Sequence, residues 1–258
     1  MGAAVHLVPN ANGILRRWGI EAKEFGGNPL DRIVELTKDG QILGTMDSKT
    51  AKKCWQHPWE LVHRVGLHEK LKKVATGEAG FGPPAVLHTS SKVVGLNPEQ
   101  GTIKLKGGTK VLADVVIGAD GIHVSCAPEL HEHLTSWIVA NQEIQSVTRA
   151  CVTDARPVST GKAAFRFMIP RKAVEADPVT APIAKHKNAL MTWYADDRRI
   201  VMYPCNNNQL LNFVCFHPET ESHATKSDGK QQILNAASLP PTETDTRCVN
   251  RLGQTSHR

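Results

Sequence analysis

The stretch that decides the fold is Ala113-Asp114-Val115-Val116-Ile117-Gly118-Ala119-Asp120-Gly121. Its apolar residues predict a buried strand over 111–117, and the small residues that follow allow another backbone or a cofactor phosphate to approach closely. The carboxylate of Asp120 then lies at the carboxyl end of the strand, where α/β sheets bind ligands. An ordinary strand with an Asp-Gly turn is the alternative, and spacing alone favours it.

Upstream of this stretch, turn residues divide the chain into short elements. Asn10 or Asn12 is suited to cap a helix that ends at Gly19. Residues 32–43 predict two strands joined by a turn at Asp39-Gly40. The segment therefore predicts a β-hairpin.

The best helix is predicted between residues 59 and 75, where apolar side chains approximate helical spacing. The Gly-Pro-rich stretch 77–84 ends it, and residues 85–94 and 102–106 then alternate as strands do. Strands that alternate with helices indicate an α/β or α+β domain.

Composition excludes several classes of protein. With 258 residues, 40% hydrophobic and 22% charged, the chain is long enough and apolar enough for a globular core. The net charge is +6, but the basic residues are scattered among acids and aromatic residues make up only 5%. A nucleic-acid-binding surface built on stacked rings is therefore not expected.

The cysteine pattern and hydropathy restrict the site chemistry and the location. Six Cys include no C-x-x-C pair, which disfavours a zinc ribbon or a redox dithiol. His131 and His133 could join Cys126 at a metal, but we expect no metal site. No apolar run approaches 18 residues, so we predict no transmembrane segment, and without a signal-like N-terminus we predict a cytoplasmic protein.

Several motifs agree with one family in the correct order. Residues 114–123 read D-x-V-I-G-A-D-G-I-H, and residues 2–5, 9–11 and 15–19 read like G-A-G-I, P-N-A and L-x-x-W-G. Residues 62–71 read like H-R-x-D-L-H-x-x-L, with Gly66 in place of Asp. The following residues match a substrate-domain sheet: Phe165-Arg166, Ile169-Pro170, Trp193, Tyr203-Pro204 and Asn212. Together they resemble the fungal members of the FAD-dependent aromatic monooxygenases of the salicylate-hydroxylase type.

The resemblance covers about residues 2–123 and 146–236 and implies an α/β plus α+β fold. It predicts a partial FAD-binding domain of the glutathione-reductase-like kind over 1–123, and a mostly antiparallel substrate-domain sheet over 146–236. The G-x-G-x-x-G and G-D-A-A-H-P motifs of the family do not occur. We therefore expect the FAD-binding domain to lack its first βαβ unit.

The resemblance also implies a cofactor site and a substrate site. Cofactor contacts fall on Gly2, Ala3, Arg64, Asp120 and Gly121. The planar donor fork of Arg64 suits the phosphates or ribityl chain of FAD, and Asp120 suits cofactor hydroxyls or the loop beneath the pyrophosphate. A surface arginine opposite Glu60 is the alternative for Arg64.

Arg166 and Tyr203 are the implied catalytic residues, facing a small aromatic substrate. A cation and a phenol there would orient an aromatic acid or phenolate, whereas a sheet-surface ion pair and a core tyrosine are equally compatible with the sequence. NADH or NADPH is the implied reductant.

Residues Val124–Gln145 interrupt the family signature. Removing these 22 residues joins Gly121-Ile122-His123 to Ser146-Val147-Thr148-Arg149 and restores G-I-H-S-V-T-R. A Val codon begins GT, a Gln codon can end in AG, and the segment has the length of a small intron. We hypothesise that 124–145 is translated intron. Residues 237–258, polar and without periodicity, are expected to form an aberrant disordered tail.

Two functions follow from the sequence. The first is NAD(P)H-dependent hydroxylation of an aromatic or polyketide-type substrate in secondary metabolism. The second is an inactive or binding-only fragment of the same family. A basic nucleic-acid-binding module is the least favoured alternative. The sequence leaves the substrate and the oligomeric state open.

Overall fold

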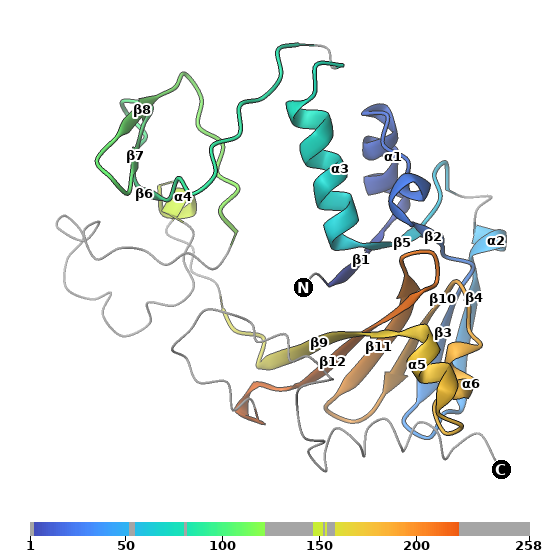
Figure 1. Cartoon of the computed structure of the whole chain (residues 1–258). Coiled ribbons are helices and arrows are strands. Elements are labelled where there is room, and N and C mark those ends of the chain that lie inside the picture. Colours follow the sequence, from blue (N-terminus) through green and yellow to red (C-terminus); the bar gives the residue numbers. More distant parts are fainter. Residues whose placement is uncertain are drawn as a thin grey trace. The chain divides into compact units, whose positions relative to one another are not determined.

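The computed structural model describes residues 3–51, 55–79, 82–121, 147–151, 153 and 158–221 (Figure 1). These form two compact units. Unit 1 contains the described residues up to Ala85 and from Gly161 onward, and unit 2 those between Val86 and Thr160. No helix of the described residues is long and apolar enough to cross a membrane.

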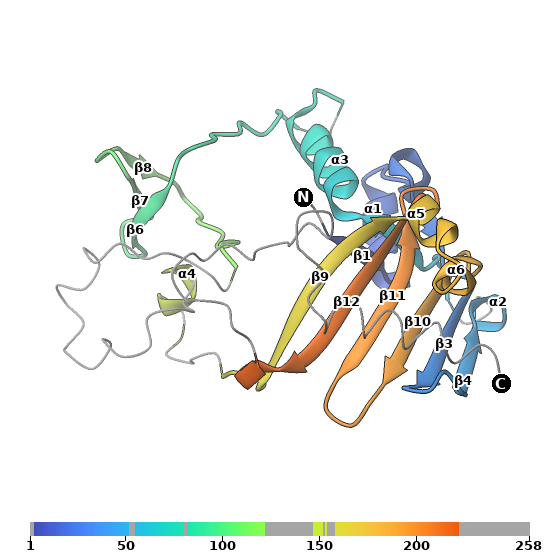
Figure 2. The same cartoon turned by 60° about the horizontal axis from the view of Figure 1, so that its bottom comes forward.

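Unit 1 is built on a six-stranded sheet with the order β4-β3-β10-β11-β12-β9 (Figure 2). Its strands are β3 (Arg32–Thr37), β4 (Ile42–Asp47), β9 (Lys162–Pro170), β10 (Ala189–Tyr194), β11 (Arg199–Cys205) and β12 (Leu210–Pro218). Only β3 and β10 run parallel, and every other pair is antiparallel. The expected hairpin over 32–43 and the mostly antiparallel sheet are both confirmed. Residues from both sides of the expected boundary at 123 build this sheet, and the division into domains stays a prediction.

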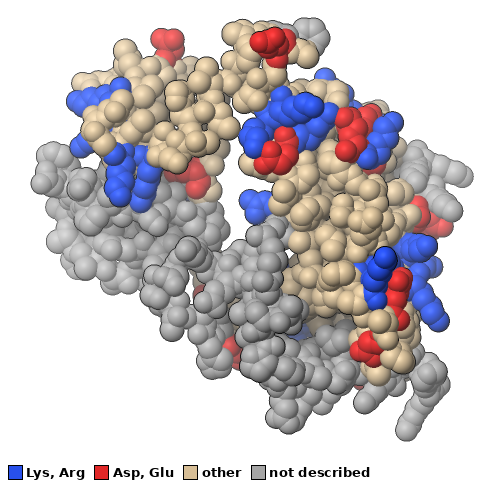
Figure 3. Space-filling view, viewed as in Figure 1, with Lys and Arg blue, Asp and Glu red and all other residues tan. Residues whose placement is uncertain are grey.

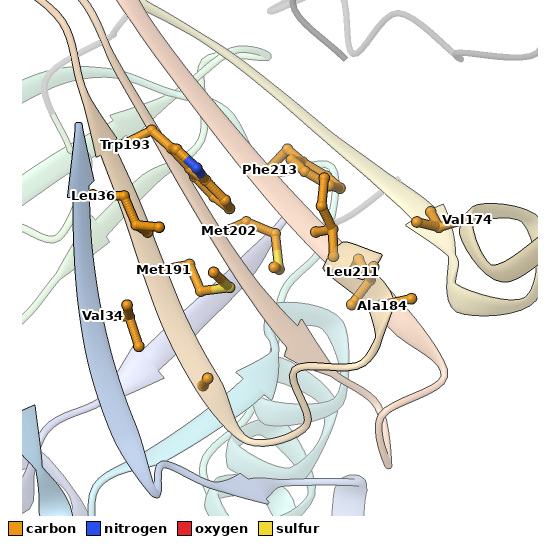
Figure 4. Close-up of a cluster of buried hydrophobic side chains, with 11 residues drawn as sticks. Val34, Leu36, Val174, Ala184, Met191, Trp193, Met202, Leu211 and Phe213 are labelled. Carbon is orange, nitrogen blue, oxygen red and sulfur yellow. The ribbon is translucent and has the colours of Figure 1, made fainter. Parts of the chain in front are cut away.

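One face of the sheet carries the larger apolar core. Alternating residues of β3, β10, β11 and β12 point to this face, where α5 (Arg171–Ala176) and α6 (Ala181–Ala184) pack (Figure 4). The core consists of Val34, Leu36, Val174, Ile183, Ala184, Ala189, Met191, Trp193, Met202, Leu211 and Phe213. Arg171 secures α5 because its guanidinium donates to the carbonyl oxygens of Ala184 and Asn208.

The opposite face packs against a three-stranded antiparallel sheet with the order β1-β5-β2. Its strands are β1 (Ala4–Leu7), β5 (Glu60–His63) and β2 (Asn28–Pro29). Leu61 of β5 is fully buried in the shared core with Ala4, Leu30, Leu190, Tyr203 and Cys205. Side chains from residues 4 to 205 therefore meet on this face. The short helix α2 (Ser48–Ala51) follows β4, and the 3-10 helix η3 (Glu219–Glu221) follows β12.

Two helices and a 3-10 turn pack on the small sheet: α1 (Pro9–Arg17), α3 (Arg64–Thr76) and η1 (Ala22–Phe25). The expected caps Asn10 and Asn12 are wrong, because α1 begins earlier, with Val8 at the N-cap position and Pro9 in the first turn. The predicted helix over 59–75 is confirmed only from Arg64. The residues before it form β5, where Leu61 and Val62 are buried and strand pairing decides their conformation.

Charged groups of opposite sign lie next to one another on the face of unit 1 that Figure 3 shows. Arg16 pairs with Glu21 at 3.0 Å, and Lys72 pairs with Glu69 at 2.5 Å. Lys70 also contacts Glu24, which joins α3 to η1. In these pairs each basic side chain lies next to an acid, as the scattered charges of the sequence indicate.

Unit 2 is a three-stranded antiparallel meander of β6 (Val93–Asn97), β7 (Thr102–Leu105) and β8 (Lys110–Leu112), with the short helix α4 (Val147–Ala150). The expected strand over 85–94 is wrong before Val93. The buried strand over 111–117 is also wrong, since β8 ends at Leu112 and Ile117 is 86% exposed. Strand β7 begins only at Thr102, opposite Leu112, and no strand of the described residues pairs with those after Ala113.

Several expectations concern residues outside those that the structure describes. These are the cofactor contact at Gly2, the segment 124–145 with its histidines, and the tail over 237–258.

Candidate functional site

The two cofactor residues expected in unit 1, Ala3 and Arg64, lie together. Strands β1 and β5 pair so that Ala4 is opposite His63, and the N–H of Arg64 donates to the carbonyl oxygen of Ala3 at 3.0 Å. Arg64 is the first residue of α3, and its side chain is exposed. The strand pairing thus places the backbone of Arg64 beside the N-terminal end of β1.

Glu60 does not pair with Arg64, as the alternative of a surface arginine opposite Glu60 would require. Its carboxylate accepts a hydrogen bond from Asn12 Nδ2 at 2.7 Å, and the same amide nitrogen donates to the carbonyl oxygen of Pro58 at 3.0 Å. Burial raises the pKa of Glu60 above its ordinary value, and the hydrogen bond from Asn12 lowers it in part. No ion pair among the described residues includes Arg64, so its donor fork is available to an anion.

Tyr203, the expected catalytic phenol, lies on β11 and is 4% exposed. Its hydroxyl donates to the carbonyl oxygen of Ala4 at 2.9 Å. Burial raises the pKa of Tyr203 well above its ordinary value, the Cys205 thiol adds to this, and the charge of Arg166 acts in the opposite direction. The phenol is therefore protonated and holds β1 against the large sheet. Its role toward a substrate stays a prediction.

Arg166, the second expected catalytic residue, is exposed on β9. It pairs in register with Val214, and Met168 pairs with Asn212, which in turn pairs with Tyr203. Because alternate residues of a strand share a face, Arg166 and Tyr203 lie on the same face of the sheet. The structure thus places both predicted catalytic residues on the face that β1 and β5 partly cover.

Asn212 belongs to this face, although the sequence singled it out only as part of a matching motif. It is fully buried, and its Oδ1 accepts the N–H of Ala4 at 3.1 Å. Its Nδ2 has no hydrogen-bond partner. The signal in the sequence is a lone amide between Leu211 and Phe213 in an otherwise apolar strand, a position where polar groups are normally paired.

Aromatic side chains gather at the covered end of the same face. Trp59 Nε1 donates to His6 Nδ1 at 3.3 Å, which leaves the proton of a neutral His6 on Nε2. The His6 ring meets Tyr203 edge to face, with ring centroids 6.1 Å apart, and Trp55 lies 5.5 Å from Trp59. Burial lowers the pKa of His6 and favours the neutral ring. This cluster did not emerge from sequence spacing because its members come from three separate segments.

Asp120 and Gly121 belong to unit 2. The Asp120 carboxylate accepts hydrogen bonds from the Thr148 hydroxyl at 2.6 Å and from the Thr148 backbone N–H at 3.3 Å. Gly121 has φ +72°, in the left-handed region that favours glycine. Gly118 lies directly against the Thr148 side chain, where a Cβ would clash. These small residues therefore allow α4 to approach the loop that carries Asp120.

The described residues include no group of three or more His, Cys, Asp or Glu side chains placed to hold a metal ion. Four buried side-chain atoms of these residues lack a hydrogen-bond partner: Asn12 Oδ1, His57 Nδ1, His63 Nε2 and Asn212 Nδ2. His63 lies opposite Ala4 in the β1–β5 pair, and Asn212 is bonded to Ala4. Two of the four atoms thus belong to side chains that flank one residue of β1.

The sequence is similar to fungal monooxygenases. It is 30% identical over 224 residues to FAD-dependent monooxygenase cfoG of Aspergillus candidus, covering 85% of this chain and 48% of that protein. It is 25% identical over 227 residues to hispidin-3-hydroxylase of Neonothopanus nambi, covering 87% of this chain and 51% of that one. The chain spans about half the length of these curated relatives. No family model matches.

Solved structures share the fold. 2,6-Dihydroxypyridine-3-hydroxylase from Arthrobacter nicotinovorans has a TM-score of 0.61 at 18% identity, and the match covers 100% of this chain and 61% of that chain. A salicylate hydroxylase in complex with its substrate has a TM-score of 0.56 at 18% identity, covering 89% and 52%. The structure of CtdE with FAD and a substrate has a TM-score of 0.65 at 16% identity, covering 86% and 49%.

Proposed function

Since the chain is 30% identical to an FAD-dependent monooxygenase and shares the fold of a salicylate hydroxylase, we propose that it belongs to the FAD-dependent monooxygenases of the salicylate-hydroxylase type. It then supplies the substrate sheet and part of the cofactor site of such an enzyme. The reaction is NADH- or NADPH-dependent hydroxylation of a small aromatic or polyketide-type compound in fungal secondary metabolism. One observation carries the proposal. The backbone of Arg64 lies beside the start of β1 and its side chain is exposed, while the sheet that packs on β1 presents Arg166 and Tyr203 on the facing side.

The residues of unit 1 fit FAD. Arg64 offers a planar fork of donors that no acid of the described residues occupies, which suits a diphosphate or the ribityl hydroxyls. The neighbouring His63 Nε2 is buried without a partner and adds a polar atom beside Ala3 and Ala4. When bound, FAD supplies the oxygen-transfer chemistry, and the protein supplies placement.

Asp120 and Gly121, which belong to unit 2, are themselves proposed as cofactor-binding residues. Asp120 accepts hydrogen bonds through both oxygens in its contact with Thr148, which fixes the loop that carries it. A carboxylate held in this way is suited to accept hydrogen bonds from cofactor hydroxyls. The backbone of Gly121 is suited to close approach because glycine adopts φ +72° without strain.

We further propose that residues 1–123 form an FAD-binding domain without its first βαβ unit. The apolar segment Val115–Ile117 supports this, because Val115 is 74% and Ile117 is 86% exposed, whereas such a run is normally buried between parallel strands. The same observation favours the second candidate function, an inactive or binding-only form of the family. Residues 146–236 then contribute the rest of the substrate sheet.

Segment 124–145 is proposed to be an insertion, encoded by unspliced intron. The residues on its two sides already meet, since Asp120 bonds Thr148 across 28 positions of chain. Sequencing spliced transcripts tests this directly. We expect a functional message without the 66 nucleotides, and their constant retention would contradict the proposal.

FAD binding and turnover distinguish the two candidate functions. The purified chain is titrated with FAD while its tryptophan fluorescence is followed, and NADH and NADPH oxidation is then measured with a panel of hydroxybenzoates. Hydroxylated product identified by mass spectrometry supports the enzyme, whereas ligand binding without turnover supports the binding-only form. We expect Arg64→Ala to weaken FAD binding about tenfold, and Arg17→Ala, an exposed residue of α1, to leave it unchanged.

A further inference from the structure

The buried amide of Asn212 suggests a contact with the substrate, an inference that rests on the proposed function. The orientation of its amide is determined by its neighbour, because the backbone N–H of Ala4 can only donate and so requires Oδ1 on its side. Nδ2 therefore points away from this N–H, and it is a fully buried donor without an acceptor. Buried donors in native proteins are nearly always paired. We therefore expect Nδ2 to donate to an acceptor atom of a bound ligand.

The surroundings of Asn212 differ across the face of the sheet. Tyr203, opposite Asn212 on β11, and Leu190 on β10 are buried beneath β1 and β5. Toward the other side, Val214 and Val201 are only half-buried and Arg166 is exposed. Asn212 thus marks the boundary between the covered and the open part of one sheet face.

The open part has the chemistry of a site for an anionic ring. Met168, Val201 and Val214 provide an apolar floor on adjacent strands, with Val201 opposite Val214 and Met168 opposite Asn212. Arg166 lies opposite Val214 on the neighbouring strand. Asn212 precedes Val214 by two positions and therefore lies on the same face. Diagonal neighbours in an antiparallel pair lie about 7–8 Å apart, a span that one substituted ring can bridge.

We propose that Asn212 is a specificity-determining residue that donates through Nδ2 to an ionised oxygen of the substrate, a phenolate or carboxylate on a flat ring. Arg166 balances the charge of this oxygen from the next strand, and the apolar floor carries the ring. The two ends of the amide then have different roles. Oδ1 accepts the hydrogen bond that holds β1 in place, and Nδ2 donates to the substrate. A ring without an ionised or acceptor oxygen leaves both Arg166 and Asn212 unsatisfied and is rejected.

The test compares ligand binding by the full chain and by matched variants. Asn212→Asp keeps an acceptor for the Ala4 N–H and replaces the donor with an oxygen. Asn212→Ser removes Nδ2 and leaves only a shorter hydroxyl, without adding a charge, and covers the case in which a buried carboxylate prevents folding. Asn28→Asp is the control, because Asn28 is equally buried but both sides of its amide are paired, with Asn188 and Asn208.

Each protein is titrated with salicylate, 3-hydroxybenzoate and 4-hydroxybenzoate, and separately with FAD, while tryptophan fluorescence is followed. Trp59 reports on the site because it packs against the cluster that contains Tyr203. We expect the wild-type chain to bind at least one hydroxybenzoate, and Asn212→Asp or Asn212→Ser to weaken that binding at least tenfold while FAD binding changes less than twofold. The control should bind as the wild type does.

Three results would overturn the inference: no hydroxybenzoate binds to the wild type, the variants bind as tightly as the wild type, or the loss appears only with FAD. The last outcome would assign Nδ2 to a flavin carbonyl. The proposed enzyme is judged separately, by NAD(P)H oxidation. Loss of binding in the Asn212 variants of a chain without turnover would keep this inference and reject the enzyme.

Discussion

The hydroxyl of Tyr203 donates to the carbonyl oxygen of Ala4 at 2.9 Å, across 199 residues of chain. The N–H of the same Ala4 donates to Asn212 Oδ1. Both backbone polar groups of one residue in β1 are thus bonded by side chains of the large sheet. Strand β1 is positioned by β11 and β12 as well as by its own partner β5.

Removing the Tyr203 hydroxyl tests the strength of this attachment. We expect Tyr203→Phe to lower the free energy of unfolding by about 1–2 kcal/mol, because it leaves a buried carbonyl oxygen short of a donor. Urea denaturation measures it. The matched control is Tyr194→Phe, whose hydroxyl donates to Glu35 at 2.9 Å on an exposed surface and should cost less than about 0.5 kcal/mol. Equal losses in the two variants would contradict a structural role for Tyr203.

The buried carboxyl group of Glu60 should make the free energy of unfolding depend on pH. Since burial raises its pKa above the ordinary value of 4.5, the folded state binds the proton more tightly than the unfolded state. Its contribution is therefore largest below pH 4.5 and is lost as the pH rises through the raised pKa. Glu60→Gln keeps an oxygen for Asn12 and removes this loss. We expect it to stabilise the protein at pH 7 by less than about 1 kcal/mol, because the carboxylate keeps part of its water shell.

Urea denaturation between pH 4 and 8 measures the Glu60 effect. The wild type should lose stability just above pH 4.5 relative to Glu60→Gln, and Glu78→Gln, at an exposed position, should follow the wild type. A constant difference between wild type and Glu60→Gln across this range would rule out the assignment.

Cysteine reactivity tests the packing beneath β1. Burial raises the pKa of the Cys205 thiol to about 11, and its side chain is fully buried, whereas Cys151 is exposed. At pH 8, about one Cys205 in a thousand is a thiolate. We expect iodoacetamide to alkylate Cys151 at least tenfold faster than Cys205 in the native protein, as read by peptide mass spectrometry. In urea the two rates should converge, and similar native rates would show that Cys205 is open to solvent.

Deleting residues 124–145 tests the proposed insertion. Because Asp120 already bonds Thr148, the deletion shortens the connection between them from 28 residues to 6. The smaller loop-closure entropy should stabilise unit 2 by about 1 kcal/mol. Hydrogen exchange of the β6–β8 amides measures this, and the contact should be lost again in Asp120→Ala made on the shortened chain. Unfolding of unit 2 on deletion would show that the segment is structural.

The sequence predicted the elements whose pattern is local. The hairpin around Asp39-Gly40 follows from residues that favour one turn geometry, and the structure has it. The helix over 59–75 was placed too early because Leu61 and Val62 satisfy helical spacing equally well, and only pairing with β1 makes them a strand. The prediction of a strand over 111–117 was wrong because an apolar run forms a strand only where a neighbouring strand offers hydrogen bonds.

The candidate site residues came from motifs, and their roles stay predictions. The structure joins two of them, Ala3 and Arg64, by one backbone hydrogen bond. Asn212 did not emerge as a site residue, because its significance depends on Ala4, 208 positions away, which occupies one side of its amide and leaves the other unpaired. Contacts of this length are invisible to periodicity.

The parallel pair of β3 and β10 has a consequence for biosynthesis. Arg32 lies opposite Ala189, so at about 5–20 residues per second a ribosome needs roughly ten to thirty seconds to deliver the partner of β3. During this time the β3–β4 hairpin displays Val34 and Leu36 without a cover. We therefore expect the yield of folded protein to depend on how well these apolar strands are shielded until β10 has been made.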